Sequence, residues 1–298
     1  MNQKTRGLIG LNIAVLIMSI AGLFAKLIPW PAPMIILGRA AVTAPCVAAY
    51  LLLRRRTLVL KCRRHAVILF GLGILMVAHW ITYFAAIQVS TVAIGILAVF
   101  TSPIMATFLE PMFDGKKAHR ADVLLALVAF AGIVLMVDDF SLSNGTFQGV
   151  LLGLISALLV TLRNIWSKSL VQEYAAPFVM FWQMFFGALV LSPLVFFVNV
   201  TVSTGDIQNL LILGVFATAI AHTLMLTSIG CLGARSTGVI MMIQPLYAIL
   251  LAVVLLGEIP SLRVIVGGAL VLSAMIVETV KQARSKEGIE HTIKADSF

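Results

Sequence analysis

Four side chains with the chemistry of a ligand site interrupt apolar stretches of this sequence: Arg39, His79, Trp80 and Tyr83. His79 and Tyr83 are four residues apart, so a helix would carry both on one face. A histidine can titrate near neutral pH, aromatic rings can stack on a solute, and a guanidinium can bind a carboxylate through two parallel hydrogen bonds. We therefore expect these residues to wall a small-molecule site. The alternative is a structural role, with His79 and Arg39 bonded to neighbouring helices.

A second polar set lies further along the chain and would complete the site. Its members are expected to form the inner lining: Asn164, Gln183, His222, Gln244 and Tyr247. Lys26 is expected to join the outer set. Either His79 or His222 could take part in proton coupling. Buried amides also lock helices together, so a structural role for Asn164 and Gln183 stays open.

The elements that carry these residues are predicted to be membrane-spanning helices. The chain has 298 residues, of which 61% are hydrophobic and 11% are charged, whereas a soluble domain is about 45–50% apolar and about 25% charged. Ten apolar runs approach the roughly 20 residues that a spanning helix needs. They fall near 7–27, 32–53, 66–88, 91–111, 121–138, 147–168, 176–198, 207–229, 234–256 and 263–280. The runs are too long and too uniformly apolar for barrel strands, so the fold class is all-α integral membrane.

The distribution of basic residues predicts that both termini are cytoplasmic. With that orientation, 17 of the 21 lysines and arginines fall in cytoplasmic segments. The outer loops hold only Arg263, while Lys26, Arg39 and Arg163 lie inside spans. Such an excess of positive charge on one side is typical of cytoplasmic loops and supports an even number of spans.

An internal repeat is indicated when the chain is shifted by 142 residues. The shift pairs Lys26 with Lys168, Pro103 with Pro245, Gly7 with Gly149, and Gly115 with Gly257. We expect two five-helix halves, 1–140 and 145–285, followed by a polar cytoplasmic tail, 286–298. Because five is odd, the second half would be inverted in the membrane, with the site between the halves. Pro103 and Pro245 are expected to kink helices and are candidate gating hinges.

The depth of the basic residues shapes the expected site. Arg39 lies about seven residues into its span, or about 10 Å deep, and no acidic residue is predicted at that depth. A carboxylate-bearing solute would compensate the charge, so zwitterionic or anionic solutes should be preferred to lipophilic cations. Arg163 is expected to snorkel to the inner interface. Gly145, Gly149 and Gly153 are expected to pack within the bundle.

Several segments resemble the EamA-type members of the drug/metabolite transporter superfamily. They are ILGRAAVTAP around Arg39, GVIMMIQPLYAILLAVVLLGE in the ninth predicted span, and the weaker counterpart IGILAVFTSPIMATFLEPMFDGK in the fourth. The resemblance covers about 1–280. It departs at Lys116, where the family usually has a glutamate, whereas Glu258 keeps that residue in the second half. The resemblance implies a ten-helix inverted-repeat bundle that exports amino acids or related metabolites across the bacterial inner membrane.

Other classes of function are less compatible with the sequence. There is no G-x-S-x-G, H-E-x-x-H or phosphate-binding loop, so we expect neither an enzyme nor ATP-driven transport. An intramembrane enzyme and a non-transporting scaffold or receptor remain the alternatives, and nothing resembles the charge rings or carbonyl filter of a channel. The net charge of +9 lies in short clusters between apolar runs, which argues against a nucleic-acid surface. No cofactor or metal is predicted. The expected partners are a small-molecule substrate and the lipid bilayer, with the oligomeric state open.

Overall fold

The computed structural model describes residues 3–113 and 120–295, and every regular element among them is a helix. The first part contains α1 (Gln3–Ile20), a 3-10 turn (Ala21–Leu23), α2 (Phe24–Leu27), α3 (Ala32–Leu53), α4 (Arg63–Val89), α5 (Val92–Val99) and α6 (Ser102–Phe113). The second contains α7 (Arg120–Met136), α8 (Gly145–Glu173), α9 (Ala176–Leu191), a 3-10 turn (Ser192–Phe196), α10 (Thr204–Leu211), a π-helix (Ile212–Ile220), α11 (Ala221–Met241), α12 (Gln244–Leu256) and α13 (Leu262–Ala295). Gly115, Lys116 and Lys117 lie outside the described residues.

The predicted spans correspond closely to apolar helical segments. Within 3–113 and 120–295, nine segments are long and apolar enough to cross a membrane, and a tenth, Asp122–Met136, is a shorter apolar helix. Each of the ten matches one predicted run to within a few residues at either end. The protein is therefore a multi-span helical membrane protein, and only the fifth predicted span falls short of the expected length.

Local sequence explains where several helices begin and end. The side chain of Thr91 accepts a hydrogen bond from the Ile94 backbone, and that of Asn144 accepts one from Phe147. Such caps satisfy amide groups that the first turn of a helix leaves without partners. Gly233 and Gly257 adopt positive φ values of 80° and 69°, a region that glycine enters without steric cost. Gly233 thereby turns the chain between the eighth and ninth predicted spans.

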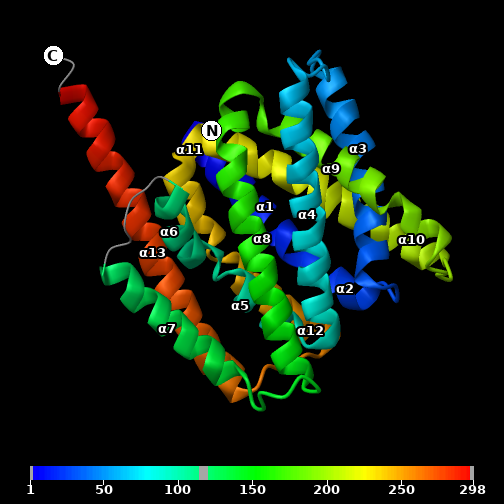
Figure 1. Ribbon diagram of the computed structural model, residues 1–298, viewed down its shortest axis with the longest axis vertical. Coiled ribbons are helices and arrows are strands. Elements are labelled where there is room, and N and C mark those ends of the chain that lie inside the picture. Colours follow the sequence, from blue (N-terminus) through cyan, green and yellow to red (C-terminus); the bar gives the residue numbers. More distant parts are fainter. Residues whose placement is uncertain (1–2, 114–119, 296–298) are drawn as a thin grey trace.

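The principal helix contacts join the two halves of the chain. α1 packs on α11, α3 on α9, α4 on α8, and α7 on α13. In each pair the first helix ends before residue 140 and the second begins at residue 145 or later. Figure 1 shows α4 beside α8 at the centre and α7 beside α13 at one edge. The bundle is thus interleaved and is not divided into two separate five-helix bodies.

Glycines lie at close approaches between helices. A Cβ atom added at Gly7 would lie 2.8 Å from Cβ of Cys231 and 3.1 Å from Cγ of Leu232, and one added at Gly149 would lie 2.5 Å from Cβ of Ser90. Gly145 and Gly153 likewise approach Val89 and Ala98. The three glycines spaced by four in α8 therefore pack within the bundle, against the end of α4 and against α5.

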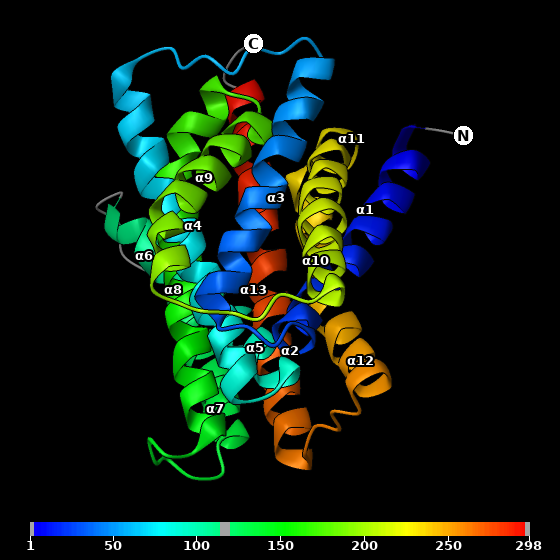
Figure 2. The same cartoon turned by 90° about the vertical axis from the view of Figure 1, so that its right-hand side faces the viewer.

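The two ends of the bundle carry different connections. Figure 2 shows that α1 begins and α13 ends at the same end as the long connection between α3 and α4. The connections from α7 to α8 and from α12 to α13 lie at the opposite end. This arrangement agrees with both termini lying on one side, and the assignment of that side to the cytoplasm remains a prediction.

Several predicted spans are broken inside the bundle, including both that contain the repeated prolines. The fourth span is divided into α5 and α6 around Phe100 and Thr101, and the ninth into α11 and α12 around Met242 and Ile243. Pro103 and Pro245 each lie in the first turn after the break. A proline there needs no N–H partner, and its ring disfavours helix at the preceding residue. The expected mid-helix kinks are therefore breaks, with the prolines starting new helices.

Candidate functional site

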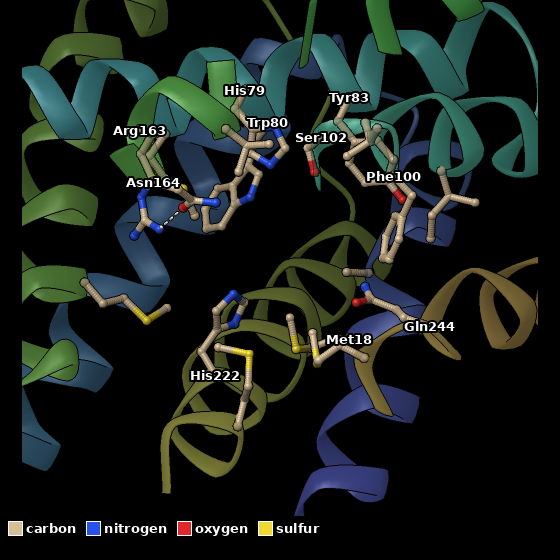
Figure 3. A pocket seen from close by; sticks show the side chains of 18 of the residues that line it. Met18, His79, Trp80, Tyr83, Phe100, Ser102, Arg163, Asn164, His222 and Gln244 are labelled. Atoms are coloured by element: carbon tan, nitrogen blue, oxygen red, sulfur yellow. Dashed lines mark hydrogen bonds between the residues drawn. The ribbon is translucent and has the colours of Figure 1, made fainter. Parts of the chain in front are cut away.

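A central cavity of about 480 Å³ lies where the broken helices meet. Its size suits a small metabolite. Seven of the ten predicted binding residues line it: Arg39, His79, Trp80, Tyr83, Asn164, His222 and Gln244. Pro103 also lines it, whereas Lys26, Gln183, Tyr247 and Pro245 do not. Figure 3 shows labelled side chains from both halves of the chain projecting into a common space.

Arg39 is a nearly fully buried cation in the cavity wall, with only 3% of the residue exposed. Its Nε donates a hydrogen bond to Oγ1 of Thr218 at 2.8 Å, and its Cζ lies 3.5 Å from the centroid of the Trp80 ring. Among the described residues, its two terminal NH₂ groups have no hydrogen-bond partner. Arg39 is thus held from one side and keeps free donors on the other, an arrangement that suits the binding of an oxyanion.

The π-helix places Thr218 beside Arg39. The Thr218 hydroxyl donates to the carbonyl oxygen of Leu213 at 2.6 Å, five residues earlier, so its oxygen can accept from Arg39. Thr43 of α3 donates to the carbonyl oxygen of Gly214 at 3.1 Å. π-Helical turns are rare and often occur at functional sites. Thr218 was not predicted from the sequence, because one threonine in an apolar run carries no distinguishing signal.

The two histidines of the cavity are anchored through their Nδ1 atoms. Nδ1 of His79 lies 3.0 Å from the carbonyl oxygen of Ser156, and Nδ1 of His222 lies 2.9 Å from that of Thr218. A carbonyl oxygen can only accept, and the Ser156 hydroxyl, 2.7 Å from Nδ1 of His79, donates instead to the carbonyl oxygen of His79 at 2.8 Å. Nδ1 therefore carries the hydrogen in both rings. In the neutral ring, Nε2 is then left as a hydrogen-bond acceptor for a solute or a proton.

Arg163 lies in the cavity wall and not at the inner interface. Its Nε and Nη2 donate to Oε1 of Gln183 at 3.3 and 2.7 Å, and its Nη1 donates to Oδ1 of Asn164 at 2.9 Å. Gln183 is fully buried. The snorkelling expected for Arg163 is therefore not observed, because two neighbouring amides supply polar partners inside the bundle. Gln183 acts on the cavity by holding Arg163.

Lys26 belongs to a polar cluster at the end of the bundle predicted to face outward. Its Nζ lies 3.8 Å from Oε1 of Glu258 and donates to the carbonyl oxygen of Ser90 at 2.9 Å. Glu258 also accepts from the backbone N–H of Val92 at 2.8 Å. These contacts tie the end of α2 to the α4–α5 turn and the end of α12. Lys26 thus helps to hold that end of the bundle together and does not line the cavity.

The remaining predicted residues lie around the start of α12. Gln244 lines the cavity, and its carbonyl oxygen accepts from Oγ of Ser19 at 3.1 Å. Pro245 is buried and Tyr247 is partly buried, both away from the cavity lining. The start of α12 therefore contributes one of its three candidate residues to the wall.

No carboxylate lines the cavity among the described residues. The acidic side chains with described environments lie elsewhere, most of them paired. Five form ion pairs: Glu110 with Lys168, Asp138 with Arg263, Glu173 with Lys61, Glu258 with Lys26, and Asp122 with Lys281. Asp206 caps α10, Glu278 accepts a hydrogen bond from Thr107, and Asp139 is exposed between α7 and α8. The described part of the chain also holds no cluster suited to a metal ion.

The rest of the wall is apolar and adaptable. Six methionines line it: Met18, Met76, Met180, Met225, Met241 and Met242. Methionine side chains are flexible and polarizable, so they can repack around solutes of different shape. This methionine wall was not predicted from the sequence, because the six residues are scattered over five of the predicted spans.

The cavity extends toward the end of the bundle where α1 begins and α13 ends. Its lining includes Ser167 near the end of α8 and Ala176 at the first residue of α9. At the opposite end, the cluster of Lys26, Ser90, Val92 and Glu258 contributes nothing to the lining. The cavity therefore lies to one side of this polar cluster.

Comparison with known proteins identifies a family. The model of the EamA-like transporter family matches residues 5–138 and again 147–279. The uncharacterized transporter YxxF of Bacillus subtilis is 22% identical over 216 residues, 70% of this chain and 68% of its own. The uncharacterized inner membrane transporter YicL of Salmonella typhimurium is 25% identical over 213 residues, 68% of this chain and 69% of its own.

The fold also resembles that of a protein of known crystal structure. The two superpose with a TM-score of 0.65, covering 95% of this chain and all of the other, at 18% sequence identity. Likeness at that identity shows a shared fold and carries no information on the solute.

Proposed function

Because this chain belongs to the EamA-like transporter family and is a membrane transporter, we propose that it is a secondary exporter of small metabolites that carry a carboxylate. Amino acids and related compounds are the substrate class that fits best. The proposed location is the bacterial inner membrane, with both termini in the cytoplasm. YicL, one of the relatives, is described as an inner membrane transporter.

The burial of Arg39 carries the proposal about substrate. A charged side chain at this depth is costly, about 2.5–3.5 kcal/mol on insertion scales at a helix centre. The described cavity offers it a hydroxyl and an aromatic ring but no carboxylate. A carboxylate on the solute would supply the missing charge through the fork of the guanidinium.

An inverted repeat would give this cavity two-sided access. Two observations support such a repeat. A shift of 142 residues converts the α1–α11 contact into the α8–α4 contact. It moves Gly7 to Gly149 and Ser90 to Leu232, and Gly7 contacts Leu232 while Gly149 contacts Ser90. The same shift maps α3 onto α9 and α7 onto α13, and in both pairs the two helices pack against each other. Rocking one half against the other would expose the cavity alternately to the two sides.

The energy source is proposed to be a gradient or exchange. The sequence contains no phosphate-binding loop for ATP, and His79 and His222 offer exchangeable protons inside the cavity. Proton coupling would use the Nε2 atoms, since both Nδ1 atoms are bonded to backbone oxygens.

Reconstitution tests the proposal. Purified protein in liposomes would be offered amino acids, nucleosides and cationic drugs, with and without a pH gradient. We expect gradient-dependent or exchange flux of a carboxylate-bearing solute. Absence of flux for every compound would contradict the proposal and favour the alternatives, an intramembrane enzyme or a non-transporting scaffold.

A further inference from the structure

We propose that the cavity takes a solute with two acidic groups, and that Arg163 is the second anion-binding residue beside Arg39. This inference rests on the proposed function and narrows its substrate class. It predicts that a dicarboxylate is preferred over the matching monocarboxylate.

The first observation is that Arg163 is positioned from behind. Gln183, which is fully buried and outside the cavity lining, accepts two of its N–H groups through one oxygen. Asn164, beside it in α8, accepts a third. A guanidinium has five N–H donors, so two remain beyond these bonds. Figure 3 shows Arg163 and Asn164 on one wall of the cavity, with His222 across the space from them.

The second observation is that both partners of Arg163 are neutral. An amide fixes the direction of a guanidinium but leaves its charge uncompensated. Arg39 is in the same condition, with Thr218 and Trp80 as its contacts. The described cavity lining therefore has two arginines and no carboxylate.

The third observation is that the described acids are unsuited to supply the missing charge. Glu110 and Glu258 lie at opposite ends of the bundle and are paired with Lys168 and Lys26. Glu278 lies in α13, which contributes nothing to the cavity lining, and it accepts a hydrogen bond from Thr107. Reaching the cavity would require any of them to leave an existing partner.

Occlusion of the cavity makes the uncompensated charge of the two arginines favour dicarboxylates over monocarboxylates. While the cavity is open, water can solvate both guanidinium groups. When the two halves close over a solute, that water is displaced and each cation needs a counter-charge, because burying an unpaired charge is costly. A solute with two carboxylates satisfies both arginines, whereas a solute with one leaves Arg163 or Arg39 unpaired.

Three five-carbon compounds provide a matched test. Glutarate has two carboxylates, glutamate has two and an amine, and glutamine replaces one carboxylate by an amide of nearly the same shape. Binding would be measured on detergent-purified protein by thermal stabilisation, and transport by exchange in liposomes. We expect glutarate and glutamate to bind about tenfold to a hundredfold more tightly than glutamine, the factor typical of one charge-assisted hydrogen-bonded contact.

Variants assign the preference to Arg163. Arg163→Gln should bring the glutamate-to-glutamine ratio close to one, and Arg163→Lys should retain part of it because the charge remains. Arg56→Gln, which removes an exposed arginine between α3 and α4, should leave the ratio at the wild-type value. Should Arg163→Gln fail to fold, the glutamate-to-glutamine ratio of the wild-type protein and that of Arg163→Lys still test the inference.

The outcomes separate this inference from the proposed function. Equal or weaker binding of both dicarboxylates relative to glutamine overturns the inference, and so does a ratio unchanged in Arg163→Gln. If carboxylate-bearing amino acids are nevertheless transported, the proposed function stands without it. Binding of dicarboxylates without flux of any solute would support the two-arginine site and contradict the transport proposal.

Discussion

The guanidinium carbon of Arg39 lies 3.5 Å from the centroid of the Trp80 ring. A cation over an indole face is stabilised by the ring quadrupole, by about 0.5–2 kcal/mol depending on how far the pair is desolvated. Trp80 thus lowers the cost of burying Arg39 without neutralising its charge. The pair keeps the arginine in the cavity wall while leaving its charge available to a solute.

Thr218 is predicted to position Arg39. Thr218→Val keeps the shape of the side chain but removes the oxygen that accepts from Nε, so Arg39 should lose its orientation. We expect a rise in KM of about tenfold, the loss expected for one hydrogen bond to a charged group, and Thr218→Ser should restore much of it. Thr223→Val is the matched control, since among the described residues the Thr223 hydroxyl bonds only to the carbonyl oxygen of Ala219, one turn earlier. A wild-type KM in Thr218→Val would contradict this role.

Gly149 is predicted to be required for the α4–α8 contact. In Gly149→Ala the new Cβ would lie 2.5 Å from Cβ of Ser90 and 3.1 Å from the carbonyl oxygen of Ala86, and such overpacking costs about 1–3 kcal/mol. The midpoint of thermal unfolding in detergent should fall. Gly71→Ala adds a Cβ that meets nothing within 4 Å, so it should be neutral or slightly stabilising. Equal midpoints for the two variants would show that the predicted close contact is absent.

The Lys26–Glu258 pair is predicted to stabilise closure of the outer end. Glu258→Gln removes the charge that faces Lys26 while an amide oxygen can still accept from Val92. Opening should become easier by up to ~1 kcal/mol, the upper range for a partly exposed pair, or about fivefold in population. Labelling of a cysteine placed at Ala21, in the cavity, by an impermeant reagent from outside would report it.

The control for that experiment removes an ion pair at the other end of the bundle. Glu173→Gln breaks the Lys61–Glu173 pair and should leave outside labelling of the Ala21 cysteine unchanged. Both variants would be made in a background without Cys46, Cys62 and Cys231. Unchanged labelling in Glu258→Gln would argue that the outer closure does not depend on this pair.

Topology is predicted to place both termini in the cytoplasm. Cysteine at position 144, between α7 and α8, should react with an impermeant reagent added to intact cells, and cysteine at position 285 should react only after the cells are opened. The prediction rests on the concentration of 17 of the 21 lysines and arginines on one side. Reaction of the position 285 cysteine in intact cells would contradict the cytoplasmic placement of the termini.

Much of the helical arrangement could be predicted because membrane spans are long. Apolar length averages over about 20 residues, so single substitutions hardly move a span. The pairing of Lys26 with Glu258 at one end of the bundle was not predicted, because apolar length does not tell which spans meet. The breaks at Pro103 and Pro245 were placed correctly along the chain, but their form depends on tertiary contacts that a proline alone does not specify.

The site was harder to predict, because depth along a span does not tell which face of a helix meets the cavity. Arg39, His79 and Trp80 stood out as polar or aromatic side chains in apolar runs. Arg163 was assigned to the interface from its depth alone, and its inward direction depends on Gln183, twenty residues away. Thr218 contacts Arg39 because it lies in a π-helix, and the residue composition of that segment does not predict a π-helix.

The most direct test of the account compares flux through wild-type protein with flux through Arg39→Gln and Arg39→Lys. Exchange of a radiolabelled carboxylate-bearing amino acid would be measured in liposomes containing equal amounts of inserted protein. We predict that Arg39→Lys is impaired although it keeps the charge, because the planar fork is lost, and that Arg39→Gln is impaired more. Wild-type flux through Arg39→Gln, or a preference of the wild-type protein for quaternary cations, would contradict the account.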